Sequence, residues 1–246
     1  MKRTAAFASL QALLLCTCGH NVTIEPLGER NIGGQKVRVE EIRFQSGKFK
    51  VVGELRLPVE SESHPAIIMV HGSGSATRDG AVPFTPLLEI FLRNGYAVFS
   101  WDKPGSGTST GAFDEGYKLT ERAAILADGI EVLAEHPAID STRFGLWGIS
   151  QAGWVMPLVL DLTDKVAFMI VVSGGGEDSI DPIQGAEAYE AALEKAGNQD
   201  YQIEVIPGVA HVLMSAKTGC LSEVGKRAYA PEYLATLEVW LQHLSQ

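Results

Sequence analysis

The segment Phe144-Gly145-Leu146-Trp147-Gly148-Ile149-Ser150-Gln151-Ala152-Gly153-Trp154 decides the fold of this chain. Its apolar first half predicts a strand, and the residues after Ser150 predict a helix. A strand that turns into a helix across one residue forces that residue into a strained conformation, so its neighbours must be small. Gly148 and Ala152 meet this requirement, although the pattern G-x-S-x-G has a second glycine where Ala152 stands. The turn is expected to expose the Ser150 hydroxyl at a helix N-terminus, where it acts as a nucleophile or merely caps the helix.

Strands and helices alternate on both sides of this segment. Short, almost wholly apolar runs predict strands covered on both faces, as in a parallel sheet between helices. These runs are Ala66–Val70, Tyr96–Trp101, Arg143–Trp147 and Ala167–Ser173. A last strand is predicted at Gln202–Ile206, and helices are predicted after Ser150 and at Leu119–Leu133, Gln184–Lys195 and Pro231–Leu244.

Two earlier runs differ from these buried strands. Lys36–Gln45 and Phe49–Leu57 alternate apolar and polar residues on either side of Gly47, which predicts an antiparallel hairpin with one wet face. We therefore expect an α/β fold with a doubly wound, mostly parallel sheet and antiparallel N-terminal strands. Residues 36–246 are expected to form one domain, because α/β folds of this length often enclose a single core.

Composition narrows the range of functions. The chain has 246 residues, of which 46% are hydrophobic and 20% charged, as is usual for a globular protein. A formal net charge of −10 opposes binding to nucleic acid or to an anionic membrane surface, since both require a basic face. The three cysteines form neither a disulfide framework nor a CxxC metal site.

Residues 1–19 differ from the rest of the chain. Lys2 and Arg3 precede a short uncharged run rich in Ala and Leu, which is typical of an export signal and too short to span a bilayer. Either a cleaved signal peptide or a lipoprotein leader, with Cys18 or Cys16 lipidated, fits this pattern. A frayed N-terminal helix of a cytoplasmic protein is the alternative. We expect an exported protein (periplasmic, secreted or lipid-anchored) without a membrane span.

A glycine-rich turn, His71-Gly72-Ser73-Gly74, follows the predicted strand Ala66–Val70. Such a turn allows main-chain N–H groups to face a site, and an acyl oxyanion needs two such donors. Ser73 and Gln151 are the natural pair for this oxyanion hole. A tight strand-to-helix turn without a function is the alternative, and a nucleotide loop is disfavoured because Thr77 stands where a third glycine belongs.

Two further loops complete the arrangement. His211 follows the last predicted strand, where an imidazole can take a proton from a serine at the end of a neighbouring strand. A carboxylate after Ser173 could orient that imidazole, and Glu177, Asp178 and Asp181 compete for this role. A structural histidine and a charged surface turn are the alternatives. The order serine, acid, histidine is that of α/β hydrolases.

At four motifs the chain resembles the α/β-hydrolase superfamily, and most of all its bacterial dienelactone-hydrolase and prolyl-oligopeptidase-related serine esterases. The motifs are His71-Gly72-Ser73-Gly74, Asp102-Lys103-Pro104-Gly105-Ser106-Gly107, Gly148-Ile149-Ser150-Gln151-Ala152-Gly153-Trp154 and Pro207-Gly208-Val209-Ala210-His211. The resemblance implies that Ser150 is the nucleophile, His211 the base and Asp178 the acid, the last from a G-x-x-D pattern. It also implies that Asp102 braces a loop, and Lys103 replaces the arginine that relatives usually have.

One departure from the family concerns the acid. Asp178 follows Ser150 by only 28 positions with one predicted strand between them, whereas relatives usually have two strands and often a lid there. Either the acid follows the sixth strand, or a lid and one strand are lost. The implied reaction is hydrolysis of small carboxylic esters or thioesters through an acyl-enzyme, with no metal or organic cofactor. A peptidase or acyltransferase with the same triad, and an inactive binding protein on this fold, are the alternatives.

Overall fold

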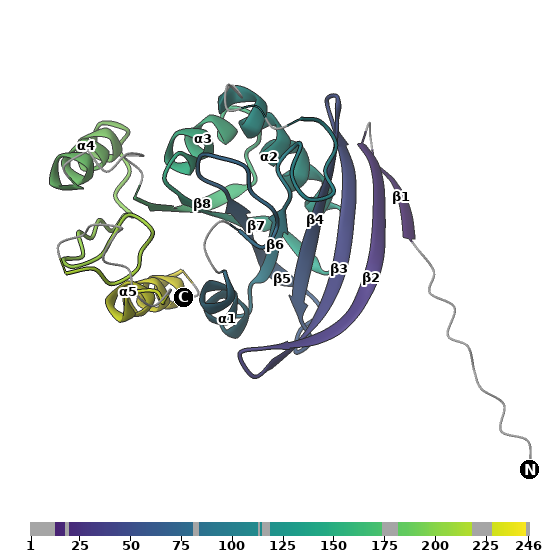
Figure 1. The fold of residues 1–246 in the computed structure, drawn as a ribbon, viewed down its shortest axis with the longest axis horizontal. Coiled ribbons are helices and arrows are strands. Elements are labelled where there is room, and N and C mark those ends of the chain that lie inside the picture. The colour runs from purple at the N-terminus through teal and green to yellow at the C-terminus, as the bar shows by residue number, and fades with distance from the viewer. Residues whose placement is uncertain are drawn as a thin grey trace, which may run out of the picture.

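The computed structural model describes residues 13–17, 20–80, 84–112, 114, 119–173, 182–217 and 228–244. One sheet of eight strands, in the order β1-β2-β3-β4-β6-β5-β7-β8, runs through this part of the chain (Figure 1). The strands are β1 (Leu13–Thr17), β2 (His20–Ile32), β3 (Gln35–Ser46), β4 (Phe49–Pro58), β5 (His64–Val70), β6 (Ala97–Trp101), β7 (Ile139–Ile149) and β8 (Val166–Val172).

The pairing of these strands confirms the predicted fold class. β1 to β4 form an antiparallel meander, and β4 pairs antiparallel with β6. β6, β5, β7 and β8 run parallel. The predicted hairpin joins β3 to β4, with Ser46 opposite Phe49 across the turn. β1 and β2 precede the first strand that the sequence pattern predicted.

Helices cover both faces of the sheet, as a doubly wound fold requires. They are α1 (Thr85–Arg93), α2 (Leu119–Ala134), α3 (Ala152–Val159), α4 (Pro182–Lys195) and α5 (Pro231–His243). The apolar residues of α2 and α3 pack in one core cluster on one face, and those of α1 and α5 in a second cluster on the other (Figure 1). The prediction of a buried parallel sheet between helices is therefore confirmed for β5, β6 and β7.

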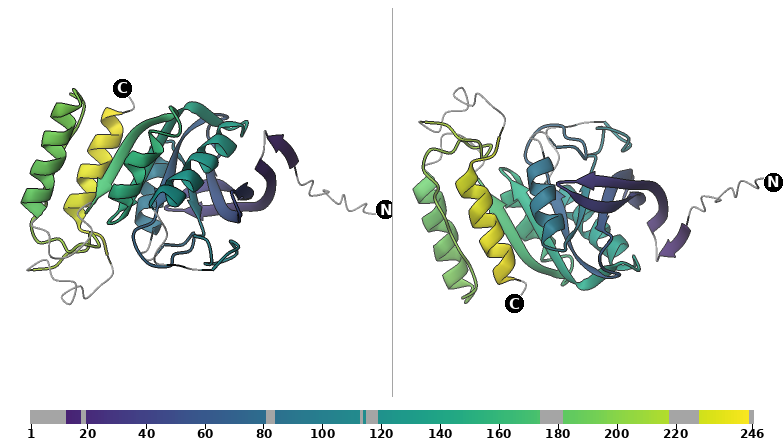
Figure 2. Two further views of the ribbon diagram at one scale, coloured as in Figure 1. Left: turned by 90° about the horizontal axis from the view of Figure 1, so that it is seen from above. Right: turned by 90° about the horizontal axis from the view of Figure 1, so that it is seen from below.

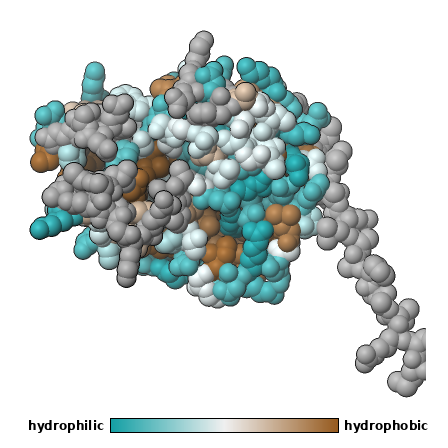
Figure 3. Space-filling model, viewed as in Figure 1, coloured by the Kyte–Doolittle hydropathy of each residue, from teal (hydrophilic) through white to brown (hydrophobic). Residues whose placement is uncertain are grey.

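The structure corrects two predictions at this end of the sheet, the last strand and the burial of β8. Gln202–Ile206 is not a strand in the structure, so β8 lies at the edge of the sheet. Most side chains of β8 are half-buried, Ala167 is exposed and only Val172 is buried, because no described strand lies beyond it. α4 buries no side chain and lies outside α5, at the end of the molecule opposite β1, in both views of Figure 2. Apolar residues are visible at the surface on this side of the molecule (Figure 3), where the sheet ends without a covering strand.

β4 corrects the prediction of a wet face. Nearly all of its side chains are buried, including the charged pair Glu54 and Arg56. Arg56 Nη2 lies 2.6 Å from Glu54 Oε1, and Arg56 Nη1 donates to the Ser100 hydroxyl at 2.9 Å. These partners satisfy the two charges inside the protein, so a polar residue at these positions does not indicate contact with solvent.

The predicted leader lies largely outside the described residues. Within residues 1–19, the structure describes Leu13–Thr17. These residues form β1 and pair with His20–Ile24 of β2. Across the described part of the chain, every helix is too short or too polar to cross a bilayer. Export and the domain limits stay predictions.

Candidate active site

The carboxyl edge of the parallel strands brings most of the predicted site residues together. A methyl group placed on Gly72, in the loop after β5, would lie 3.2 Å from Ser150 Cβ and 3.7 Å from Ser150 Oγ. The loop expected to form the oxyanion hole is therefore in contact with the expected nucleophile. At the neighbouring strand end, Ser173 Oγ donates to the main-chain oxygen of His211 at 2.9 Å. This bond ties the histidine loop to the same edge of the sheet.

Ser150 occupies the strained turn that the sequence predicted. Its φ is +60°, in the left-handed region that side chains other than glycine rarely adopt. The next residue, Gln151, is the N-cap of α3, so the simple role of a helix-capping serine is not the one that Ser150 has. Ser150 is 7% exposed, because Gly72 lies against it; the predicted exposure of this residue is wrong.

The neighbours of Ser150 explain why the motif departs from G-x-S-x-G. A Cβ atom on Gly148 would lie 2.5 Å from Ala152 Cβ and 2.9 Å from Met156 Sδ. Glycine at position 148 therefore leaves room for the methyl group of Ala152, which is fully buried. Gly148 before Ser150 and the small residue Ala152 after it therefore allow the strand and the helix to approach closely at the turn.

Two buried cations bind the main chain of the His71–Gly74 loop. Lys103 Nζ donates to Gly72 O at 2.6 Å and to Gly74 O at 2.7 Å. Arg122 Nη2 donates to His71 O and, at 3.2 Å, to Gly72 O. Each of the two residues is 5% exposed. Burial lowers the pKa of Lys103 to about 7, with a further contribution from Arg122, and burial lowers the pKa of Arg122 to about 10.

Sequence reasoning missed both cations as parts of the site. The sequence marks Lys103 only as a replacement for an arginine, and Arg122 lies within a predicted helix. A signal was present, because Leu119, Arg122, Ala123 and Leu126 follow the i, i+3, i+4, i+7 spacing of the face of α2 that packs on the sheet. An arginine on such an apolar stripe is buried and must find acceptors within the protein.

His71 has a structural role beside these cations. Its Nε2 lies 2.6 Å from the main-chain oxygen of Trp101, and the side chain is buried. Burial lowers its pKa to about 4, since the loss of hydration outweighs the bond to Trp101, and Lys103 and Arg122 lower it further. The ring is thus neutral at physiological pH and donates its Nε2 proton to Trp101, so it does not serve as a base.

Asp102 braces the loop after β6, as the family resemblance implied. Its carboxylate accepts bonds from Arg78 N at 2.7 Å, Arg78 Nη2 at 2.8 Å and Thr108 N at 2.9 Å. Burial alone would raise the pKa of this carboxyl group, but the Arg78 and Thr108 bonds hold it below its usual value. Gly107 cannot carry a side chain, because a Cβ atom would lie 2.3 Å from the Asp102 carboxylate. This contact explains the glycine that ends the D-x-x-G-x-G motif.

His211 lies in a compact loop and not directly after a strand. Ala210 N donates to Met214 O, and Ala216 N donates to Gly208 O, each at 2.8 Å. Ala230 N, at the start of α5, donates to Leu213 O at 2.8 Å and so fixes the loop to that helix. His211 is therefore positioned by the hydrogen bonds of this loop and not by a preceding strand.

The acid of the predicted triad lies outside the described residues. Residues 174–181, which contain Glu177, Asp178 and Asp181, are not described. The structure therefore places the loop that contains Ser73 against Ser150 and the loop that contains His211 at the neighbouring strand end, and the choice of acid stays a prediction.

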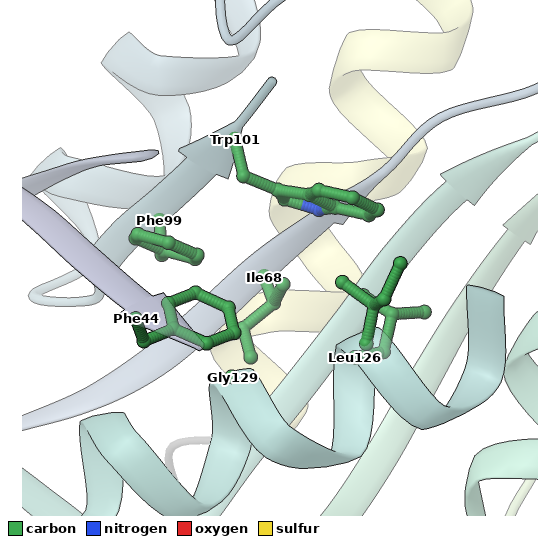
Figure 4. Close-up of a pocket in the computed structure, with 7 residues that line it drawn as sticks. Phe44, Ile68, Phe99, Trp101, Leu126 and Gly129 are labelled. Atoms are coloured by element: carbon green, nitrogen blue, oxygen red, sulfur yellow. The ribbon is translucent and has the colours of Figure 1, made fainter. Parts of the chain in front are cut away.

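An apolar gap elsewhere in the molecule is not part of this site. It lies between the sheet and α2, with side chains of Phe44, Phe99, Trp101 and Leu126 around it (Figure 4). The one polar atom among these side chains, Trp101 Nε1, donates to Met69 O at 3.1 Å. Nothing in this lining could orient a polar substrate.

Comparison with known proteins gives a family and several relatives. Residues 46–201 match the model of the X-Pro dipeptidyl-peptidase (S15) family, a stretch that includes Ser150 and ends before His211. The thiohydrolase aneE of Aspergillus aculeatus is 29% identical over 118 residues, which are 46% of this chain and 36% of that protein. The putative carbamate hydrolase RutD of Variovorax paradoxus is 27% identical over 149 residues, which are 60% of this chain and 51% of that protein.

The match therefore spans about a third of the first relative and about half of the second. A solved structure with the same fold is a dienelactone hydrolase-like promiscuous phosphotriesterase from metagenomic libraries. It is 14% identical, with a TM-score of 0.61 over 85% of this chain and 98% of that chain. At this identity the likeness concerns the fold alone, and it agrees with the sheet order and helix layers described above.

Proposed function

We propose that this chain, which belongs to the X-Pro dipeptidyl-peptidase (S15) family, is a serine hydrolase that cleaves small carboxylic esters or thioesters through an acyl-enzyme on Ser150. The observation that carries the proposal is the conformation of Ser150. A serine at φ +60° between a buried strand and a helix, with a glycine-rich loop against it, has the geometry of a nucleophile elbow. Strain of this kind persists where a function requires it.

The reaction proceeds in two steps that use the same residues twice. His211 takes the proton of Ser150 as the hydroxyl oxygen attacks the carbonyl carbon of the substrate. The N–H groups of Ser73 and Gln151 stabilise the negative charge on the carbonyl oxygen, and Asp178 orients the imidazole. The leaving alcohol or thiol receives the proton from His211. Water, deprotonated by His211, then attacks the acyl-enzyme and releases the acid.

Two structural facts support this assignment of roles. Gln151 is the N-cap of α3, and the first N–H groups of a helix lack partners within the helix and can therefore donate to an oxyanion. The hydrogen bond from Ser173 to His211 O brings the histidine loop to the strand end next to the one that carries Ser150.

The first test is hydrolysis of p-nitrophenyl acetate, together with labelling by a fluorophosphonate. We expect the wild type to hydrolyse the ester and to be labelled at Ser150, and Ser150→Ala to lose both. Ser61→Ala, at an exposed serine on the surface, is the matched control and should keep both. A folded wild type that neither reacts with the ester nor binds the label would instead favour a binding protein on a hydrolase scaffold.

The family name favours a peptidase as the second candidate, and the aneE name favours a thioester substrate. These candidates share the nucleophile, so mutation of Ser150 does not separate them. The candidates are separated by kcat/KM, measured for p-nitrophenyl acetate, an acetyl thioester and an Xaa-Pro-p-nitroanilide. We expect the ester or thioester to be preferred; a clear preference for the Xaa-Pro amide would replace the esterase assignment with the peptidase one.

A further inference from the structure

The hydrogen bonds of Lys103 and Arg122 fix the orientation of one particular peptide group. Both side chains donate to the oxygen of Gly72, from Lys103 Nζ at 2.6 Å and from Arg122 Nη2 at 3.2 Å. In a planar trans peptide the N–H points opposite to the C=O of the same unit. The N–H that shares this unit with Gly72 O belongs to Ser73, which is the first expected oxyanion donor. Lys103 and Arg122 therefore determine the direction of the Ser73 N–H.

Arg122 also binds the side chain of Gln151, the residue whose main-chain N–H is the second expected donor. Its Nη1 donates to Oε1 of Gln151, while its Nη2 binds the oxygens of His71 and Gly72. One planar guanidinium group thus bridges the loop after β5 and the first residue of the turn into α3. The rigid fork of arginine is suited to holding two such partners at a fixed separation.

This arrangement buries the Lys103 amine and the Arg122 guanidinium group close together. Within the described part of the chain neither Lys103 nor Arg122 forms an ion pair with a carboxylate, and Arg122 Nε is buried without a hydrogen-bond partner. Burial of charge without a counter-charge is unfavourable, and a loop that only needed to be folded would be served by neutral donors. Unfavourable groups of this kind gather at functional sites.

We propose that Lys103 and Arg122 are positioning residues that aim the N–H groups of Ser73 and Gln151 at the carbonyl oxygen of the substrate. The proposal rests on the proposed function. Neither side chain is expected to touch the substrate, since Lys103 Nζ and both Nη atoms of Arg122 are occupied by main-chain oxygens and by Gln151, and Arg122 Nε is buried. Donors that are held in place before the reaction stabilise the oxyanion without reorganisation, and this gain appears in the transition state and not in substrate binding.

The test uses Lys103→Met and Arg122→Met, with kcat and KM measured separately for p-nitrophenyl acetate. Removal of one oxyanion donor lowers kcat by about 10²- to 10³-fold, so a donor that is only misaimed should lower kcat by about 10- to 100-fold. We expect KM to stay within about twofold, because the ground state does not use these donors. The affinity for a trifluoromethyl ketone, whose adduct with Ser150 carries an oxyanion, should fall by a factor similar to that of kcat.

Conservative variants and matched controls separate positioning from folding. Lys103→Arg keeps the charge and the donors and should recover most of kcat, whereas Arg122→Lys keeps the charge but not the fork and should recover less. Lys36→Met and Arg143→Met, at exposed sites, should leave every value unchanged. If the methionine variants do not fold, Arg122→Lys still tests the positioning role, because that role predicts a loss in kcat at constant KM.

Two results would overturn the proposal. One is a folded Lys103→Met and Arg122→Met with wild-type kcat and wild-type ketone affinity. The other is a loss of kcat that parallels a loss of thermal stability and a rise in KM, since that pattern indicates a structural role. Both results presuppose a wild type that the fluorophosphonate labels at Ser150. An unlabelled, folded wild type would instead refute the proposed function, and the positioning role with it.

Discussion

The ammonium group of Lys103 lies 2.6 Å from the main-chain oxygen of Gly72, the residue whose backbone packs against Ser150. The side chain thereby joins the motif after β6 to the loop after β5. The same two loops are joined again by Lys103 N, which donates to Ala76 O at 3.0 Å, and by Arg78, which binds Asp102. The glycine-rich loop is therefore held from several directions, although its glycines would leave it flexible in isolation.

The stability of the protein is predicted to depend on the protonation of Lys103. Burial lowers the pKa of this group from its usual 10.5 to about 7. Between these two values the unfolded chain binds the proton and the native protein does not, so the free energy of unfolding rises with pH over this range. Below about pH 7 both states bind the proton, and the penalty of the buried charge is fully present.

Urea unfolding of the wild type and of Lys103→Met from pH 6 to pH 10 tests this prediction. The stability of the wild type relative to the variant should rise as pH increases above about 7. Lys36→Met, at an exposed lysine, is the control for the loss of an ammonium group at the surface. A flat difference for Lys103→Met would mean that the buried amine keeps an ordinary pKa.

Gly72→Ala is predicted to lower activity more than stability. The added methyl group would lie 3.0 Å from Ile149 O and 3.2 Å from Ser150 Cβ, so the loop or the turn must shift by a few tenths of an ångström. Misplacement of reacting groups by about 1 Å can lower the rate by about 10²-fold, and we expect a loss in kcat of about tenfold or more. Gly185→Ala, in α4 with open space around it, is the control and should be as active as the wild type. Equal kcat for both variants would contradict the tight contact between Gly72 and Ser150.

Gly129→Ala is predicted to stabilise the protein. Gly129 lies within α2 beside the apolar gap of Figure 4, and its added methyl group would lie 3.4 Å from the Phe44 ring, at ordinary contact distance. Alanine is favoured over glycine in a helix interior by about 0.8–1.0 kcal/mol, and we expect a gain of about 1 kcal/mol in the free energy of unfolding. Gly145→Ala is the contrasting variant, because its methyl group would lie 2.1 Å from the Phe168 ring. A destabilised Gly129→Ala would show that α2 cannot accept even one methyl group here.

Local rules were sufficient to predict the turn at Ser150. The small residues at positions 148 and 152 and the change from apolar run to helix specify that turn within a few residues. The buried strands β5, β6 and β7 were likewise predictable, because their apolar runs have no alternative to burial. The resemblance to the family added the roles of the residues, which geometry alone does not assign.

Other features depend on partners distant in sequence. Gln202–Ile206 alternates apolar and polar residues as a strand does, but a strand also needs a neighbouring edge, and β8 is not paired with it. The role of Arg122 follows from the approach of α2 to the loop after β5, across 50 residues of sequence to Gly72. A charged side chain on a helix does not by itself indicate which carbonyl groups it will meet.

Export of the protein can be tested from its N-terminal mass in the native host. We propose that residues 1–19 are removed or lipidated, so the mature chain should begin near Cys18 or Gly19 or carry a lipid on Cys18 or Cys16. Intact-mass measurement distinguishes these products directly, and substitution of Lys2 and Arg3 by Glu should reduce processing. A chain that retains Met1 at full abundance would establish that the leader is not used.

The identity of the acid is the prediction that bears most directly on the triad. Asp178, Glu177 and Asp181 lie in the short segment between β8 and α4, and the G-x-x-D pattern favours Asp178. Loss of the carboxylate that orients a catalytic histidine lowers kcat by about 10⁴-fold in a well-studied triad, so Asp178→Ala should lower kcat by about 10³-fold or more at constant KM. Glu177→Ala and Asp181→Ala, each one to three residues away, are the matched controls and should keep activity within about threefold. If Asp181→Ala shows the large loss, the acid lies three residues later; if none of the three does, His211 is oriented without a carboxylate from this segment, and the short spacing after Ser150 reflects the loss of the usual acid.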